Sequence, residues 1–168
     1  MHWLVELYEK FGNQKDQEGV SLSERALRSA MLAEREGHDS ALITACLLQD
    51  LGKILRLAEK AHLRQWEEDD TDSIPDELRA SQALSKLFGL QITEPIRLQA
   101  KAADYFWNLD NGSDTWPPSP EEERFVRHPY FERALMVVHY RERSTEEKQT
   151  VPSFRSFLPH LEISRRNS

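Results

Sequence analysis

The sequence contains few residues that could crosslink the chain or anchor it in a membrane. Its single cysteine, Cys46, rules out an intrachain disulfide. Its longest apolar run, 41–48, is far too short to cross a bilayer, since a spanning helix needs about 20 residues. The N-terminus shows no cleavable signal pattern. We therefore expect a cytoplasmic protein without membrane contact, in which Cys46 is a buried structural thiol.

Positive charge is also scarce. Lysine and arginine number 22 against 29 acidic residues, so the formal net charge is −7. Because phosphate backbones are bound by a net basic surface, this balance argues against a nucleic-acid partner. The sequence has no glycine-rich phosphate loop, nucleophile elbow or paired-cysteine zinc motif. None of its six histidines stands four residues from another, which is the spacing of a helical zinc pair.

What the chain does contain is apolar residues at helical spacing, and no segment shows the alternation of a strand pair. Ser21 and Glu24 have capping-box spacing, Asp39 or Ser40 can cap the following helix, and Gly37 separates the two. The fold class is therefore all-α, as a single bundle of about six to seven helices. The helices expected are 3–11, 21–37, 40–48, 75–88, 93–106, 121–142 with an interruption near Pro129, and 154–163.

The length and composition fit one domain spanning 1–168, with a short helix and tail over 150–168. Two segments are predicted to be surface loops. The segment 64–73 is highly charged and rich in aspartate, and 111–120 combines glycine, serine and aspartate with three prolines.

The most informative point is the end of the helix over 41–48. Every residue of that run except Thr44 is apolar, so the helix should be buried on nearly all sides. The polar residues Gln49 and Asp50 follow at once. An ionised Asp50 held there is costly unless it meets a metal, a cation or several hydrogen bonds. This turn is therefore the candidate functional site.

The segment SLSERALRSAMLAEREGHDSALITACLLQDLGKIL, residues 21–55, resembles the heart of the HD-domain family. It is most similar to the branch that includes mixed-valent di-iron oxygenases acting on phosphonates, where the pattern reads EHxLQxAxLAxxxGxxxxLxxAALLHDIG. The resemblance continues through LFGLQITEPIRLQAKAADYF, residues 87–106, and HPYFERALMVVHYRE, residues 128–142. It covers most of 20–145 in order and implies an HD-domain-like helical fold.

The resemblance also implies a metal site built from histidines and aspartates, and here those positions are substituted. Only Asp50 keeps the family identity. Arg25 and Arg141 cannot bind a metal, because a guanidinium stays protonated and has no free lone pair. Ala103 replaces a lysine that contacts an anion in the branch, and 111–120 lacks its glycine-rich loop. We therefore predict no metal and no cofactor. The expected vestigial pocket comprises Arg25, Gln49, Asp50, Asp76, Gln99 and Arg141.

We predict that Arg25, Arg141 or both occupy the former metal volume and pair with Asp50, and also with Asp76. The alternative for Arg25 is an exposed position on an amphipathic helix, and for Asp50 a helix-end residue without a role. Further candidate ligand contacts are Lys53, Tyr105 and Trp107. The simpler interpretation of Lys53 is a solvated charge, and that of the two aromatic residues is core packing.

Three functions compete at this point. The first is a non-catalytic HD-like pseudoenzyme that binds a partner protein or a small ligand in the vestigial pocket. The second is a metal-free enzyme of a specialised biosynthetic pathway, with Asp50 or Asp76 as general acid or base and Arg25 holding an anionic substrate. The third keeps a hard metal on the oxygens of Asp50, Asp76, Gln49 and Gln99, against the repulsion of two arginines. Assembly into a homo-oligomer is compatible with all three.

Overall fold

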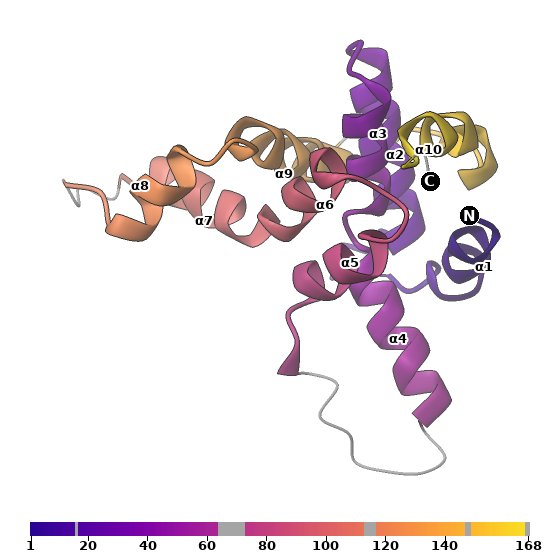
Figure 1. Cartoon of the computed structure of the whole chain (residues 1–168). Coiled ribbons are helices and arrows are strands. Elements are labelled where there is room, and N and C mark those ends of the chain that lie inside the picture. The colour runs from indigo at the N-terminus through magenta and orange to yellow at the C-terminus, as the bar shows by residue number, and fades with distance from the viewer. Residues whose placement is uncertain (16, 64–72, 113–116, 147–148, 167–168) are drawn as a thin grey trace.

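The computed structural model describes residues 1–15, 17–63, 73–112, 117–146 and 149–166 (Figure 1). Throughout these residues the regular structure is helical, with no strand and only two isolated bridges, Lys15 to Ser21 and Phe88 to Arg165. The all-α prediction is confirmed, with more helices than the six to seven expected. They are α1 (His2–Phe11), α2 (Leu22–Arg35), α3 (Ser40–Leu48), α4 (Leu51–Leu63), α5 (Asp76–Leu84), α6 (Leu90–Arg97), α7 (Gln99–Asp110), α8 (Pro120–Val126), α9 (Phe131–Glu146), a 3₁₀ turn (Phe154–Phe157) and α10 (Leu158–Ser164).

The boundaries of α2 and α3 follow their local sequence. The Ser21 hydroxyl accepts a hydrogen bond from the backbone N–H of Glu24, whose carboxylate accepts one from the backbone N–H of Ser21. Gly37, at φ +80°, takes the left-handed conformation that lets the chain turn after α2. Asp39 then caps α3 by accepting from the N–H of Leu42. These short-range predictions are confirmed.

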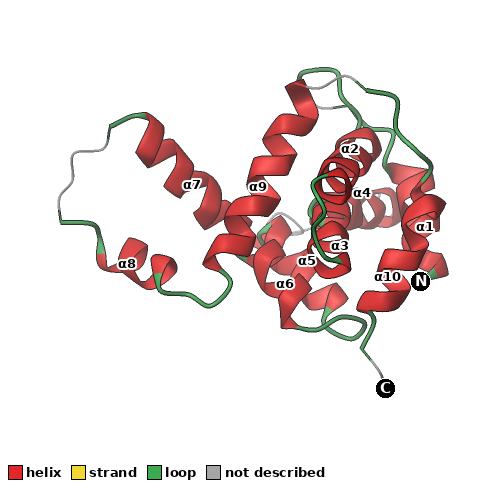
Figure 2. Ribbon diagram, turned by 90° about the horizontal axis from the view of Figure 1, so that it is seen from above, coloured by secondary structure: helices red, strands yellow, loops and turns green. Residues whose placement is uncertain are grey.

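Helix α3 lies at the centre of the main body, where it packs against α2, α6, α9 and α10 (Figure 2). From Leu42 onward all of its residues are buried, including Thr44 and Cys46. Burial raises the pKa of the Cys46 thiol, so it stays protonated and unreactive. The expected all-round burial of this helix is confirmed.

Three of the expected helix boundaries were wrong. The helix α4 (Leu51–Leu63) was not predicted, since Gly52 suggested a stop whereas it lies within the helix. The predicted helix over 93–106 is two helices that meet at Leu98, and the first begins at Leu90 rather than at Thr93. Helix α5 ends at Leu84, four residues before the expected end, and Phe88 instead forms an isolated bridge with Arg165. Tertiary packing overrides local signals in each case.

A second apolar cluster lies apart from the main core. Helices α7 and α8 project from the body, and α9 runs from this projecting arm into the body (Figures 1 and 2). The interruption predicted near Pro129 is confirmed, since it separates α8 from α9. The arm has its own buried residues, Leu98, Ala102, Phe125, Ala134 and Val138.

The predicted loop over 64–73 lies outside the described residues except at residue 73, and so do residues 113–116 of the loop predicted over 111–120. The described parts of this second loop, 111–112 and 117–119, are not helical, and α8 begins at Pro120. Among the helices that are described, none has both the length and the apolar character needed to span a membrane.

Candidate functional site

The turn between α3 and α4 places Gln49 and Asp50 inside the molecule, each only 2% exposed. Gly52 lets this turn approach the start of α5, because a Cβ atom at this position would lie 1.8 Å from the carbonyl oxygen of Asp76. The signature-like sequence Gln49-Asp50-Leu51-Gly52 therefore combines two buried polar side chains with one close backbone contact. The turn therefore brings α3, α4 and α5 together.

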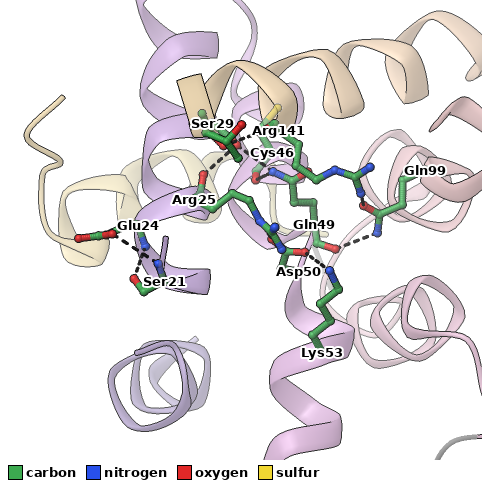
Figure 3. A network of polar contacts seen from close by, with 12 residues as sticks. Ser21, Glu24, Arg25, Ser29, Cys46, Gln49, Asp50, Lys53, Gln99 and Arg141 are labelled. Carbon is green, nitrogen blue, oxygen red and sulfur yellow. Dashed lines mark hydrogen bonds and ion pairs between the residues drawn. The ribbon is translucent and has the colours of Figure 1, made fainter. Parts of the chain in front are cut away.

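Asp50 is held by two cations (Figure 3). Nε of Arg25, from α2, lies 2.8 Å from Asp50 Oδ2, and Nζ of Lys53 lies 3.6 Å from Oδ1. The predicted pairing of Arg25 with Asp50 is found, and the alternative of an exposed Arg25 is wrong, since this residue is 9% exposed. Asp50 is likewise more than a helix-end residue, because its carboxylate joins α2 to α4.

Tyr8 of α1 lies close enough to this ion pair for both charges to act on its hydroxyl. Its hydroxyl donates a hydrogen bond of 3.0 Å to the carbonyl oxygen of Leu47. Burial, and then the negative charge of Asp50, raise the pKa of Tyr8 well above its ordinary value, while Arg25 acts in the opposite direction. The phenol therefore remains protonated at any physiological pH.

A chain of amides connects the turn to the helices opposite. The Gln49 amide donates to Ser29 Oγ at 2.9 Å and to the Cys46 carbonyl at 3.1 Å. Because Ser29 Oγ itself donates to the carbonyl of Arg25 at 2.8 Å, it must accept from Gln49, which sets the orientation of that amide. Gln49 Oε1 is consequently a buried acceptor with no hydrogen-bond donor among the residues that the structure describes. The site thus retains one unsatisfied oxygen.

Arg141 reaches the same region from α9. It donates to Gln99 Oε1 at 3.3 Å, and Gln99 Nε2 donates to the backbone carbonyl of Gln49 at 2.8 Å (Figure 3). Burial lowers the pKa of Arg141, and the charge of Asp50 opposes that shift. Five of the six predicted pocket residues are therefore linked through side chains, or through the backbone of the α3–α4 turn. These five are Arg25, Gln49, Asp50, Gln99 and Arg141.

Arg25 and Arg141 border a cavity of about 470 Å³. Arg25 is buried and Arg141 half-buried, whereas Glu18, Glu142 and Glu146 are exposed. This cavity, called here the Arg141 cavity, therefore combines two guanidiniums with an acidic rim. It is lined by Gln17, Glu18, Arg25, Arg141, Glu142, Thr145 and Glu146.

The remaining predicted residues lie elsewhere. The carboxylate of Asp76 accepts a 3.0 Å hydrogen bond from Arg56 of α4, a partner that the sequence had not singled out. Tyr105 packs in the arm against Phe131, with ring centroids 5.3 Å apart. Trp107 is 68% exposed, so its interpretation as a core residue was wrong. The roles of Tyr105 and Trp107 as ligand contacts stay predictions.

The polar network also includes four residues that the sequence did not single out, namely Tyr8, Ser29, Arg56 and Tyr140. Tyr140 is buried, with its hydroxyl 2.7 Å from His38 Nε2 and hydrogen-bonded to Glu36. Helical periodicity could have marked Tyr8 as buried. Its partner, the Leu47 carbonyl, comes from packing that periodicity does not reveal.

The donor set does not fit the metal that the resemblance implies. In the described parts of the chain, no group of three or more His, Cys, Asp or Glu side chains is arranged to hold an ion. At the family positions, Asp50 is the one carboxylate in contact with the network, and two cationic groups already lie within 3.6 Å of it. A divalent ion there would compete with fixed positive charges rather than meet free ligands.

No model of a known protein family matches the chain. The chain is, however, 27% identical over 179 aligned residues to hydroxymethylphosphonate dioxygenase of Gimesia maris, an alignment that covers 95% of this chain and 84% of that protein. This similarity fits the resemblance to the phosphonate-oxygenase-like HD branch. It extends over nearly the whole chain, well beyond the segment around Asp50.

Proposed function

We propose that this chain is an HD-domain-like pseudoenzyme that works without metal and binds a small ligand in the Arg141 cavity. One observation carries the proposal. The guanidinium of Arg25, at the position where the resemblance expects a histidine ligand, lies 2.8 Å from the carboxylate of Asp50. A cation of the protein itself thus neutralises the aspartate that the resemblance makes a metal ligand.

Simple electrostatics supports a site without metal. Two unit charges 4 Å apart interact by about 4 kcal/mol at an effective dielectric of 20, so a divalent ion would interact with each neighbour by about 8 kcal/mol. Asp50 attracts such an ion, but Arg25 and Lys53 both repel it from within 3.6 Å of the same carboxylate. The two positive charges of the protein therefore offset the attraction that Asp50 would offer to an ion.

The shape and charge of the Arg141 cavity suit a small polar molecule. Its volume of about 470 Å³ lies in the range of roughly 300–1,000 Å³ that is typical of ligand pockets. An anionic group would be bound by Arg25 and Arg141, since a guanidinium can form paired hydrogen bonds to a carboxylate. The exposed Glu142 and Glu146 favour a cationic or hydrogen-bond-donating group at the other end of the ligand.

The same contacts argue for binding rather than acid–base catalysis. Asp50 and Asp76 each accept a hydrogen bond from a guanidinium, from Arg25 and Arg56 respectively. Such an arrangement engages the carboxylate and holds it in place, whereas a general base must present a free lone pair to its substrate. The metal-free enzyme is therefore the weaker of the two proposals.

Elemental analysis tests the absence of metal. The protein would be measured as purified and after anaerobic loading with iron(II), manganese(II) and zinc(II), beside an HD-domain protein that retains the His-Asp pair. We expect metal well below one ion per chain under every condition. Near-stoichiometric metal that a chelator removes would contradict the proposal.

Ligand binding is tested by NMR titration with a panel of amino acids and dicarboxylates. We expect a ligand whose chemical-shift changes centre on Arg25 and Thr145. Its affinity should fall roughly ten- to a hundredfold in Arg141→Gln, because one charged contact contributes about 1.5–3 kcal/mol. Arg124→Gln is the matched control, since it removes the same charge from an exposed position on α8. Equal weakening by both variants would indicate a general charge effect rather than a pocket.

A further inference from the structure

A separate cavity of about 180 Å³ lies in the projecting arm, between α7 and α8 (Figure 2), and is called here the arm cavity. Its α7 side consists of residues at helical spacing, which share one face of that helix. Its α8 side includes Ser119, the residue that caps α8. The cavity therefore depends on both helices of the arm. It is lined by Lys101, Asp104, Tyr105, Asn108, Ser119, Glu121, Glu122 and Phe125.

The arm cavity is distinct from the polar network around Asp50. Gln99, the first residue of α7, directs its amide to the backbone carbonyl of Gln49 at 2.8 Å. Lys101 is two residues further along α7 and therefore lies on a different face of the helix. No residue that lines the arm cavity also lines the Arg141 cavity. A ligand bound in the arm would thus occupy a site of its own.

Two aromatic rings form the apolar part of the lining. Tyr105 and Phe125 pack edge to face, with ring centroids 6.2 Å apart. Phe131 of α9 contacts both rings, at centroid distances of 5.3 and 5.0 Å, and supports them without bordering the cavity. Because the face of an aromatic ring carries partial negative charge, it attracts a cation placed over it. The aromatic part of the lining therefore favours an organic cation.

The polar part of the lining is mostly acidic. The carboxylates of Asp104, Glu121 and Glu122 stand against one cation, Lys101, so two formal negative charges are uncompensated. Across the described residues, no ion pair involves any of these four side chains, whereas Asp50 of the central network pairs with an arginine. The carboxylates of the arm cavity are therefore available to a positively charged ligand.

The position of two of these acids has a simpler partial explanation. Glu121 and Glu122 belong to the first turn of α8, where negative charge is favourable at the positive end of the helix dipole. That preference does not account for Asp104 and Asn108, which line the opposite side of the cavity from the middle and end of α7. Polar groups thus border the cavity from both helices, together with the two rings.

We propose that the arm cavity binds a small aliphatic diamine. Alkylamines have pKa values near the 10.4 of a lysine side chain, so a diamine carries two positive charges at pH 7, which match the charge of the lining. Its ammonium groups contact the carboxylates, and its methylene groups pack against Tyr105 and Phe125. A volume of 180 Å³, below the roughly 300 Å³ at which drug-sized pockets begin, selects a short chain. The proposal does not depend on the ligand of the Arg141 cavity.

Isothermal titration calorimetry of the full-length chain tests the site with three probes, namely putrescine, 1,4-butanediol and magnesium chloride. We expect saturable binding of putrescine at low ionic strength. Butanediol, its uncharged analogue, and magnesium, an inorganic dication, should each bind at least tenfold more weakly. Butanediol binding as tight as that of putrescine would show that charge is not recognised. Equally tight magnesium binding would show that the acidic side chains attract any dication. Either result would overturn the proposal.

A pair of double variants locates the binding. Asp104→Asn combined with Glu122→Gln removes one carboxylate from each side of the cavity and should weaken putrescine binding about tenfold. Asp110→Asn combined with Glu123→Gln is the matched control, since it removes two exposed carboxylates from the same helices outside the cavity. The control should keep the affinity within about twofold, and circular dichroism checks the fold of both proteins. Equal affinity of the two double variants would overturn the proposal.

The aromatic contact is tested at Tyr105. Tyr105→Phe keeps the ring and should bind putrescine within about twofold of wild type, whereas Tyr105→Leu should weaken binding at least threefold. Hydrogen exchange in α7 and α8 would check that the arm stays folded in both variants. Wild-type affinity in Tyr105→Leu would overturn the proposal. Failure of putrescine to bind would leave the proposed function standing, and stoichiometric metal in the wild-type chain would contradict only the proposed function.

Discussion

At the scale of single residues, Asp50 is the side chain on which the site depends. It is buried at the end of an apolar helix, and its charge is balanced by Arg25 at 2.8 Å and Lys53 at 3.6 Å. Removing one partner of a buried ion pair typically costs about 3–5 kcal/mol, because the other charge is left uncompensated. Replacing both partners by apolar side chains of similar volume is often neutral.

This asymmetry predicts the result of a double-mutant cycle. Arg25→Met should lower the free energy of unfolding by about 3 kcal/mol, and Asp50→Leu should have a similar effect. The double variant should be more stable than the sum of the two losses predicts, with a coupling of about 1–3 kcal/mol. Urea unfolding followed by circular dichroism measures all four proteins. Strictly additive losses would show that the two charges do not depend on each other.

At the scale of elements, the approach of α4 to α5 depends on one glycine. Gly52 lies where a Cβ atom would be 1.8 Å from the carbonyl oxygen of Asp76, so any side chain would push the two helices apart. This contact keeps Arg56 of α4 within hydrogen-bond distance of the Asp76 carboxylate. The same contact explains why a glycine stands inside a helix, where it is otherwise unfavourable.

Gly52→Ala should therefore destabilise the protein by about 1–3 kcal/mol, because overpacking outweighs the better helix propensity of alanine. Gly89→Ala is the control, since a Cβ atom there would mainly meet the flexible end of the Gln91 side chain. This variant should lower the free energy of unfolding by less than about 1 kcal/mol. Thermal and urea unfolding measure both variants. A Gly52→Ala protein as stable as wild type would mean that α5 shifts freely.

At the scale of the whole molecule, α9 joins two apolar clusters. Ala134 and Val138 pack in the arm, whereas Val137 and Tyr140 belong to the main core. Arg141 follows directly, so the same helix carries a residue of the Arg141 cavity. The arm cluster is small and depends on a few aromatic contacts, such as Phe125 against Phe131 with centroids 5.0 Å apart. We expect it to open independently of the main core.

Phe125→Ala tests this expectation. A buried phenylalanine replaced by alanine typically loses about 3–5 kcal/mol, which a small cluster cannot absorb. Hydrogen exchange should accelerate in α7 and α8 while α3 keeps its protection. Leu47→Ala, in the main core, is the control and should accelerate exchange throughout the chain. Equal acceleration of all helices in Phe125→Ala would instead indicate one cooperative unit.

The limits of prediction from the sequence are clearest in the helices. The missed helix α4 begins immediately after the turn at Gln49 and Asp50, and its Gly52 reads locally as a stop. The break at Leu98 has no strong signal of its own, and the segment 93–95 suggested a start that the structure places at Leu90. In both cases contacts with distant helices outweigh preferences that extend over only a few residues.

The sequence alone determined the features that neighbouring residues control. These include the capping box of Ser21 and Glu24, the turn at Gly37 and the buried character of α3, because each rests on groups a few positions apart. The sequence left open whether Arg25, Arg141 or both would pair with Asp50, and only the tertiary structure decided between them. Asp50 meets Arg25 from 25 residues away, and Asp76 meets Arg56 rather than an arginine of the predicted pocket. The reason is physical: pairing of buried charges depends on distances that arise only when the helices pack.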